Sequence, residues 1–292
     1  MRDSIITSVV FPLALGVIML GLGLSLTVSD FRRVMKSPKV VAIALACQVL
    51  LLPLVCFAVV YVFSLPPVLA VGMLLLAAAP GGTSANLFSH LADGDVALNI
   101  SLTAINSFLS IITLPLIVNF ALVHFYGEGK VIPLQFGKII QVFFIVLGPV
   151  VIGMIFRNKA EHFAESMAPF VKKASALFLF LVIGIAVASD WQNLKTYVPQ
   201  VGLAALSFNL LSLGVGYCVP RLLKIGRRQA TAVGMEIGIH NSVLAITIAM
   251  SPVLLANPAM ATPAAVYGLI ANVTAAMFGF WVSRRMKVGV AL

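Results

Sequence analysis

The sequence predicts an all-α, polytopic membrane protein. Its 292 residues are 61% hydrophobic and only 10% charged, and their mean hydropathy is +1.10. A water-soluble domain of this length cannot cover so much apolar surface with so few charges. The apolar stretches are long and continuous, and the alternating ten-residue segments typical of an outer-membrane barrel are absent from the sequence. These observations favour a bundle of membrane-spanning helices.

Nine apolar windows of helical length follow one another along the chain. Each has about 20 apolar residues, which is enough to cross a membrane. The first window has no A-x-A cleavage site, so we expect a retained helix. The third and fourth windows are separated only by Asp93-Gly94-Asp95. The expected spans are residues 4–28, 39–63, 67–91, 95–124, 134–156, 169–189, 197–223, 230–255 and 261–283.

With nine spans, 15 of the 19 basic residues fall on one side of the membrane. Such an excess marks the cytoplasmic side, so we expect an N-terminus outside and a C-terminus inside, in the plasma (inner) membrane. The basic residues lie at span ends, so the net charge of +10 does not indicate a nucleic-acid partner. The 15 residues are Arg32, Arg33, Lys36, Lys39, Arg157, Lys159, Lys172, Lys173, Arg221, Lys224, Arg227, Arg228, Arg284, Arg285 and Lys287.

Two of the expected spans contain helix-breaking sequences near their middle. The third contains PGGTSAN (residues 80–86), in which proline removes a backbone donor and two glycines weaken the helix. The eighth contains EIGIHN (residues 236–241) in a comparable place. If spans 1–4 and 6–9 form an inverted repeat, these breaks occupy matching positions. A pair of interrupted spans in matching positions indicates the binding site of a transporter.

Glu236 is a carboxylate inside an apolar span, whereas the other eight acidic residues lie at or between span ends. A charge at the centre of a membrane span costs about 2.5–3.5 kcal/mol, so we expect a partner, and a cation is the natural one. Freed backbone and side-chain oxygens at the breaks suit a hard cation. The helix N-termini near residues 83–86 and 241–242 suit an anion. A cation site beside an anion site is the layout of a symporter.

Simpler interpretations exist for each of these features. Small residues such as those of PGGTSA also allow helices to pack closely, and Glu236 could be a hydrogen-bonded structural carboxylate. His240 follows Glu236 by four residues, which is half of a metal site, but no other histidine or cysteine is near in sequence. The three cysteines, Cys47, Cys56 and Cys218, lie in apolar stretches and are expected to be packing residues.

The segments APGGTSANLFSHLADGDVALNISLT and MEIGIHNSVLA resemble the bile acid:sodium symporter family, and the likeness extends over essentially all nine spans. The corresponding family motifs read close to GGTASN, VALS-x-x-x-T and E-x-G-x-Q-N. The resemblance implies one transporter unit (residues 1–292) built round two crossing broken helices. A core domain (residues 39–133 and 191–285) would move against a panel domain (residues 1–38 and 134–190). Sodium-coupled uptake of an organic anion by alternating access would follow.

The resemblance also implies two sodium sites. The first would use Asn86, Asn99, Thr103, Glu236 and the backbone at Ala85. The second would use Gln48, Glu236, the carbonyls of Ile237 and Ile239, and His240.

Three of these positions depart from the family pattern. Ala85 and Asn99 stand where serine is usual, and His240 stands where glutamine supplies an amide oxygen. Hard cations prefer oxygen ligands, and imidazole has none. The sequence therefore favours one well-formed sodium site within a range of one or two ions, and His240 could instead bond to a neighbouring carbonyl.

By the same resemblance, Thr83, Asn241 and Asn272 would line the cavity between core and panel and hold the substrate carboxylate. The cavity-forming spans have no buried Arg or Lys, so dipoles, amides and hydroxyls would hold the anion. This suits a small hydroxy or keto acid, or an amphipathic bile-acid-like monocarboxylate, better than a phosphorylated metabolite. The expected partners are this anion, Na⁺ and the lipid bilayer; nothing in the sequence indicates an obligatory protein partner.

Other function classes fit the sequence less well. An efflux or proton-coupled carrier would keep the fold and reduce or lose the sodium coupling. Related arsenite carriers depend on a cysteine near the broken helix, and here the cysteines lie elsewhere. A membrane-embedded enzyme is not indicated, because the chain has no G-x-S-x-G, no H-E-x-x-H and no paired intramembrane aspartates.

Overall fold

The computed structural model describes residues 37–82, 84–127, 136–167, 191–251 and 254–288, with isolated positions between residues 16 and 29 and between 170 and 177. These ranges are helical apart from short connections. Among them, four helices are long and apolar enough to cross a membrane: Pro38–Val62, Val96–Tyr126, Tyr197–Leu222 and Pro258–Arg284. The predicted class, an all-α membrane protein, is confirmed. The expected spans 4–28 and 169–189 fall largely outside the described residues.

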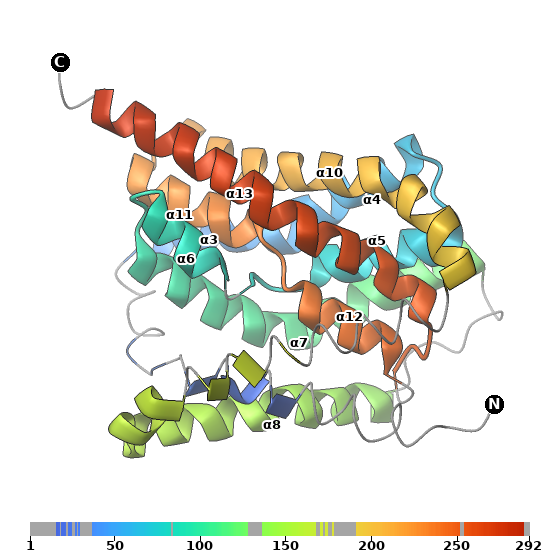
Figure 1. Cartoon of the computed structure of the whole chain (residues 1–292), viewed down its shortest axis with the longest axis horizontal. Helices are drawn as coiled ribbons and strands as arrows, with labels where there is room; N and C mark the ends of the chain where they lie inside the picture. The colour runs from blue at the N-terminus through green and yellow to red at the C-terminus, as the bar shows by residue number, and fades with distance from the viewer. Residues whose placement is uncertain are drawn as a thin grey trace.

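The first part of the chain forms a continuous helix followed by a broken one (Figure 1). Pro53 has no N–H to donate, and the turn before it widens to a π-helical turn that contains Gln48. The elements are α3 (Pro38–Ala46), η2 (Cys47–Leu51), α4 (Leu52–Val62), α5 (Pro67–Ala78), α6 (Ser84–Leu91) and α7 (Val96–Tyr126).

The later part contains a second broken helix, α11 and α12, which lies between α7 and the long helices α10 and α13 (Figure 1). The elements are α8 (Phe136–Lys159), α10 (Trp191–Leu222), α11 (Arg227–Gly238), α12 (Ser242–Met250), η3 (Pro258–Ala261) and α13 (Thr262–Val288). Helices α10 and α11 approach closely at Gly216, where an added Cβ would lie 2.9 Å from the Cα of Gly234. Small residues permit such close packing in membranes.

The turn before α5 and the turn before α11 have the same backbone geometry. Ser64 and Lys224 adopt left-handed φ values of 48° and 63°. The next residue, Leu65 or Ile225, donates its N–H to the carbonyl five residues earlier, at 3.1 and 2.9 Å. This is the bond that closes a helix in the Schellman motif, and the buried apolar residue that accompanies it is present in both turns.

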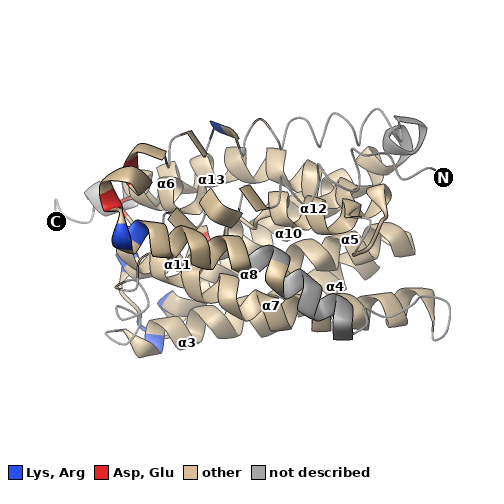
Figure 2. Ribbon diagram, turned by 90° about the horizontal axis from the view of Figure 1, so that it is seen from below, with Lys and Arg blue, Asp and Glu red and all other residues tan. Residues whose placement is uncertain are grey.

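The N-terminal ends of α3, α7 and α11 are tied together at one end of the bundle. Lys39 Nζ donates to the carbonyl of Leu223, in the turn before α11, at 3.0 Å. The N–H of Asp95 donates to the carbonyl of Arg228 at 3.0 Å. Most of the described basic and acidic residues lie at this end (Figure 2). The three helices therefore start at a common level.

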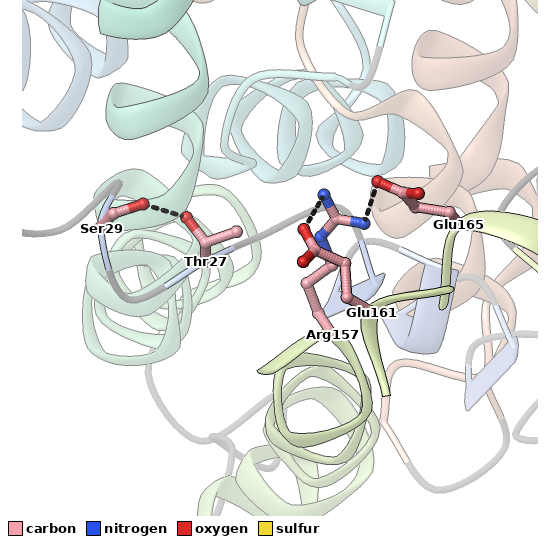
Figure 3. A network of polar contacts seen from close by, with 5 residues as sticks. All are labelled: Thr27, Ser29, Arg157, Glu161 and Glu165. Atoms are coloured by element: carbon pink, nitrogen blue, oxygen red, sulfur yellow. Dashed lines mark hydrogen bonds and ion pairs between the residues drawn. The ribbon is translucent and has the colours of Figure 1, made fainter. Parts of the chain in front are cut away.

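At the C-terminal end of α8, Arg157 binds two carboxylates. Its Nη2 lies 3.3 Å from Glu161, and its Nη1 lies 3.1 Å from Glu165 (Figure 3). In the same view the hydroxyls of Thr27 and Ser29 are 2.7 Å apart. Exposed ion pairs add little stability, so the Arg157 network mainly orients the chain that follows α8.

Candidate ion and substrate site

The two helix breaks cross each other near the middle of the bundle (Figure 1). Helix α5 ends at Ala78 and α11 ends at Gly238, as the helix-breaking sequences predict. Gly82 N–H donates to Ile239 O at 2.6 Å, and Asn241 N–H donates to Pro80 O at 2.8 Å. Non-helical backbone at membrane depth must be satisfied by other protein groups, and here each break satisfies the other.

Glu236 lies in the last turn of α11, against this crossing, with none of its surface exposed. Thr103 Oγ1 donates to Oε2 at 2.6 Å, and Asn106 Nδ2 donates to Oε1 at 3.1 Å. The backbone N–H of Gly81 also donates to the carboxylate. A Cβ on Gly81 would overlap the carboxylate atoms, so a larger residue there would displace the Glu236 carboxylate from its present position. These three donors are all neutral groups.

The residues expected in the first sodium site lie on α6, α7 and α11, three helices that pack against one another. Asn99 is fully buried, and its Nδ2 donates to Ala232 O on α11 at 2.7 Å. Asn86 and Ala85 lie in the first turn of α6, and the Ala85 N–H donates to Gly82 O at 3.0 Å. Thr103 is the only one of the described first-site residues for which a direct bond to Glu236 is found.

The residues expected in the second site meet at the end of α5. Gln48 Nε2 and His240 Nδ1 both contact the carbonyl oxygen of Ala79, at 3.1 and 3.2 Å. Because a carbonyl accepts, the hydrogen of the neutral His240 ring is on Nδ1. This is the carbonyl bond anticipated for His240. Ile237 and Ile239 are buried at the end of α11, and the Ile239 carbonyl already accepts from Gly82.

Four buried amide oxygens near Glu236 have no hydrogen-bond partner among the described residues. Buried polar atoms are nearly always paired, and an exception indicates an ion, a water molecule or a catalytic role. In each of three of these amides, the nitrogen end is bonded to a carbonyl or to Glu236 while the oxygen end is left free. The four atoms are Gln48 Oε1, Asn86 Oδ1, Asn99 Oδ1 and Asn106 Oδ1.

The three expected substrate residues are placed differently. Asn241 caps α12 and accepts from the N–H of Leu244 at 3.0 Å. Beside it, Ser242 Oγ is buried without a partner among the described residues. Asn272 is on α13, is exposed, and donates to a carbonyl of its own helix at 2.7 Å. Thr83 lies outside the described residues.

Sequence reasoning missed three polar residues at this crossing. Asn106 bonds directly to Glu236. Asn209 Nδ2 and Tyr267 Oη both donate to Gly238 O at 2.9 Å, and so hold the end of α11. Only Asn106 carried a signal: Asn99, Thr103 and Asn106 follow the i, i+4, i+7 spacing of one helix face.

Comparison with known proteins extends over most of the chain. The family model described as the Sodium Bile acid symporter family matches residues 12–197. The chain is 30% identical over 281 residues to the uncharacterized sodium-dependent transporter YocS of Bacillus subtilis, covering 94% of this chain and 83% of that protein. It is 26% identical over 257 residues to the probable chloroplastic sodium/metabolite cotransporter BASS2 of Oryza sativa, covering 88% and 59%. It is 25% identical over 248 residues to the human ileal sodium/bile acid cotransporter, covering 84% and 70%.

Proposed function

Because the chain belongs to the sodium bile acid symporter family, we propose that it is a sodium-coupled secondary transporter that imports a small or amphipathic organic anion by alternating access. The family is one of transporters, so the chain is a multi-pass membrane transporter and not an enzyme. Its relatives are named as sodium-dependent or sodium/metabolite carriers, which supports sodium as the coupling ion.

The observation that carries this proposal is the fully buried Glu236, bound by neutral donors, with unpartnered amide oxygens on the helices of the crossing. A buried carboxylate is costly unless it is paired. A cation would neutralise it, and the free amide oxygens of Asn86 and Asn99 would replace water as ligands. Carboxylate and amide oxygens are the ligands of hard cations. Asn86, Asn99, Thr103, Glu236 and the backbone at Ala85 form the first sodium site in this proposal.

For the architecture, we propose nine spans in which spans 1–4 and 6–9 form an inverted repeat. The matched turns before α5 and α11 and the crossing of the two breaks support this arrangement. The core would be residues 39–133 and 191–285 and the panel residues 1–38 and 134–190. The end of the bundle that is rich in basic residues would face the cytoplasm of a plasma (inner) membrane.

The substrate anion would bind on the panel side of the crossing, beside the N-termini of α6 and α12. Asn241 and the buried, unpartnered Ser242 hydroxyl at the start of α12 support this placement. Thr83 and Asn272 would complete the site. Amides, hydroxyls and helix N-termini hold one carboxylate well, so the substrate class is a monocarboxylate, from hydroxy or keto acids to bile-acid-like molecules.

Uptake into proteoliposomes tests the proposal. The purified full chain is reconstituted and given labelled hydroxy acids, keto acids and a bile acid, with an inward gradient of either NaCl or choline chloride. We expect the sodium gradient to accelerate uptake of at least one monocarboxylate severalfold. Equal uptake of every compound in choline would overturn sodium coupling, and uptake driven by a proton gradient instead would favour the proton-coupled alternative.

A further inference from the structure

Asn106 is the residue at the crossing to which the proposed function gives no role. Its side chain is 2% exposed. Its Nδ2 donates to Glu236 Oε1 at 3.1 Å, whereas Thr103 binds the other oxygen, Oε2. Its Oδ1 is buried and has no partner among the described residues. Because Oδ1 and Nδ2 share one carbon atom, this free oxygen lies close to the Oε1 side of the carboxylate.

By residue count, Gln48, Asn106 and Glu236 lie at similar distances from the end of the bundle where their helices start. The starts of α3, α7 and α11 are tied together by the bonds of Lys39 and Asp95. Each of the three side chains follows its helix start by about ten residues, which is about 15 Å at 1.5 Å per residue. That distance is half of a hydrocarbon core of about 30 Å.

His240, which stands where the family pattern has a glutamine, cannot supply an oxygen to a cation. Its Nδ1 bonds to the Ala79 carbonyl, where it meets the amide nitrogen of Gln48. Its Nε2 is buried with no partner among the residues that the structure describes, and a nitrogen is a poor ligand for a hard cation. Two other side chains of the helices around the crossing have a buried, unpartnered oxygen to offer: Gln48 with Oε1 and Asn106 with Oδ1.

We propose that Asn106 is a ligand of a second cation, with Oδ1 supplying the oxygen that His240 lacks. Its Nδ2 holds Glu236 Oε1 in place, so one side chain both orients the carboxylate and completes the ligand set with Gln48. The inference rests on the proposed sodium coupling. It also revises the expectation of a single well-formed site: two sodium ions with one monocarboxylate would carry one net positive charge, and transport would respond to membrane potential.

Sodium binding to the purified full chain tests the assignment without knowledge of the substrate. NaCl is titrated at pH 8 against choline chloride at constant ionic strength, and the thermal unfolding midpoint is followed. We expect Asn106→Leu to raise the sodium half-saturation concentration about tenfold, equivalent to about 1.4 kcal/mol. The matched control is Ser107→Ala, whose hydroxyl donates only to Thr103 O on its own helix; its sodium response should change less than about twofold.

Asn106→Asp separates a ligand from a structural donor. An ionised aspartate cannot donate to Glu236, but it keeps an oxygen for the cation, and a bound cation favours the ionised form. A ligand role predicts a sodium half-saturation concentration equal to or below that of the wild type. A purely structural role predicts a rise of about tenfold relative to the wild type, and that result would overturn the assignment even if the Leu variant did not fold.

The double variant Asn106→Leu/His240→Gln tests whether one oxygen replaces the other. Glutamine at position 240 restores an amide oxygen, so we expect most of the lost sodium affinity to return. A double variant as weak as Asn106→Leu alone would contradict the replacement. If sodium does not specifically stabilise the wild-type chain, the proposed function fails. If sodium stabilises the wild type and Asn106→Leu equally, only the role of Asn106 is refuted.

Discussion

In α5–α6 the helix breaks off at Ala78, and in α11–α12 it breaks off at Gly238. Each broken end is held by an amide side chain from the helix that precedes it. Gln48 Nε2 donates to the carbonyls of Ala77 and Ala79, at 3.3 and 3.1 Å, and Asn209 Nδ2 donates to Gly238 O at 2.9 Å. The turns before α5 and α11 also match. The first half of the described bundle (α3 to α7) and the second half (α10 to α13) therefore share one backbone arrangement.

The two holding amides differ at their oxygen ends. Asn209 Oδ1 accepts from Thr274 Oγ1, and Tyr267 adds a second donor to Gly238, so the end of α11 is held by a complete network. Gln48 Oε1 has no partner among the described residues. Complete buried networks fix one arrangement, whereas partly satisfied ones leave groups free for a ligand.

The charge and the free oxygens also come from different halves. Glu236 is on α11, in the second half, and the four unpartnered amide oxygens are on α3–η2, α6 and α7, in the first. In the proposed function, a cation bound between them would therefore tie the two halves together. Its departure would remove this link and leave the halves joined by the hydrogen bonds and helix packing described above. This gives a physical reason for ion binding to control movement.

Glu236→Gln should have the largest effect on this arrangement. It removes the charge supplied by the second half but keeps the size of the side chain, so we expect sodium-driven uptake to fall by at least about a hundredfold, equivalent to about 2.7 kcal/mol. Uptake in proteoliposomes measures it, with circular dichroism and gel filtration as controls for folding. Normal uptake across a range of sodium concentrations would show that the carboxylate is not the cation's counter-charge.

Much of the fold could be predicted from the sequence, because its signals are local. Hydropathy identified the helical class, and Pro80 with its two glycines predicted the break in α5–α6. The nine-span count, the inverted repeat and the domain division remain predictions, and spans 4–28 and 169–189 fall largely outside the described residues. No local signal predicts that Gly81 and His240 pair across the crossing, because that contact depends on tertiary packing.

The candidate site was predictable where a residue stood out from its span. Glu236 did so because a carboxylate is rare in an apolar helix. Asn209 and Tyr267 did not, because a single amide or phenol in a long helix does not reveal which carbonyl it will bind. The structure brings Thr103 and Asn106 directly to Glu236, and the individual ligand roles stay predictions.

Gly81→Ala should have the next largest effect, because it places a methyl group from the first half against the Glu236 carboxylate of the second half. The added Cβ would overlap the Glu236 carboxylate, so we expect sodium-driven uptake to fall about thirtyfold, or about 2 kcal/mol. Gly214→Ala is the matched control, because a Cβ on Gly214 of α10 has nothing within 4 Å. Equal uptake by the two variants would show that the crossing is looser than the structure indicates.

Gln48→Leu and Asn209→Leu test whether the free and the paired amide have different roles. Gln48→Leu removes a free oxygen, and we expect the sodium half-saturation concentration to rise about tenfold. Asn209→Leu removes two buried hydrogen bonds, one to Gly238 O and one from Thr274, and we expect a loss of about 1–3 kcal/mol in stability with little change in sodium affinity. Thermal unfolding with and without sodium measures both quantities. If Gln48→Leu instead lowered the stability and Asn209→Leu instead weakened sodium binding, the proposed difference between the free and the paired amide would be wrong.

The smallest expected effect tests what the halves share. Ser64 and Lys224 hold left-handed φ values in matching turns, a conformation that costs a residue with a Cβ about 1–2 kcal/mol and glycine almost nothing. Glycine also loses more entropy on folding, so Ser64→Gly and Lys224→Gly should each stabilise the protein by up to about 1 kcal/mol, and by similar amounts. Lys224→Ala controls for the lost charge and should give no gain. The unfolding midpoint in detergent measures all three, and unequal gains from the two glycines would show that the turns are not equivalent in energy.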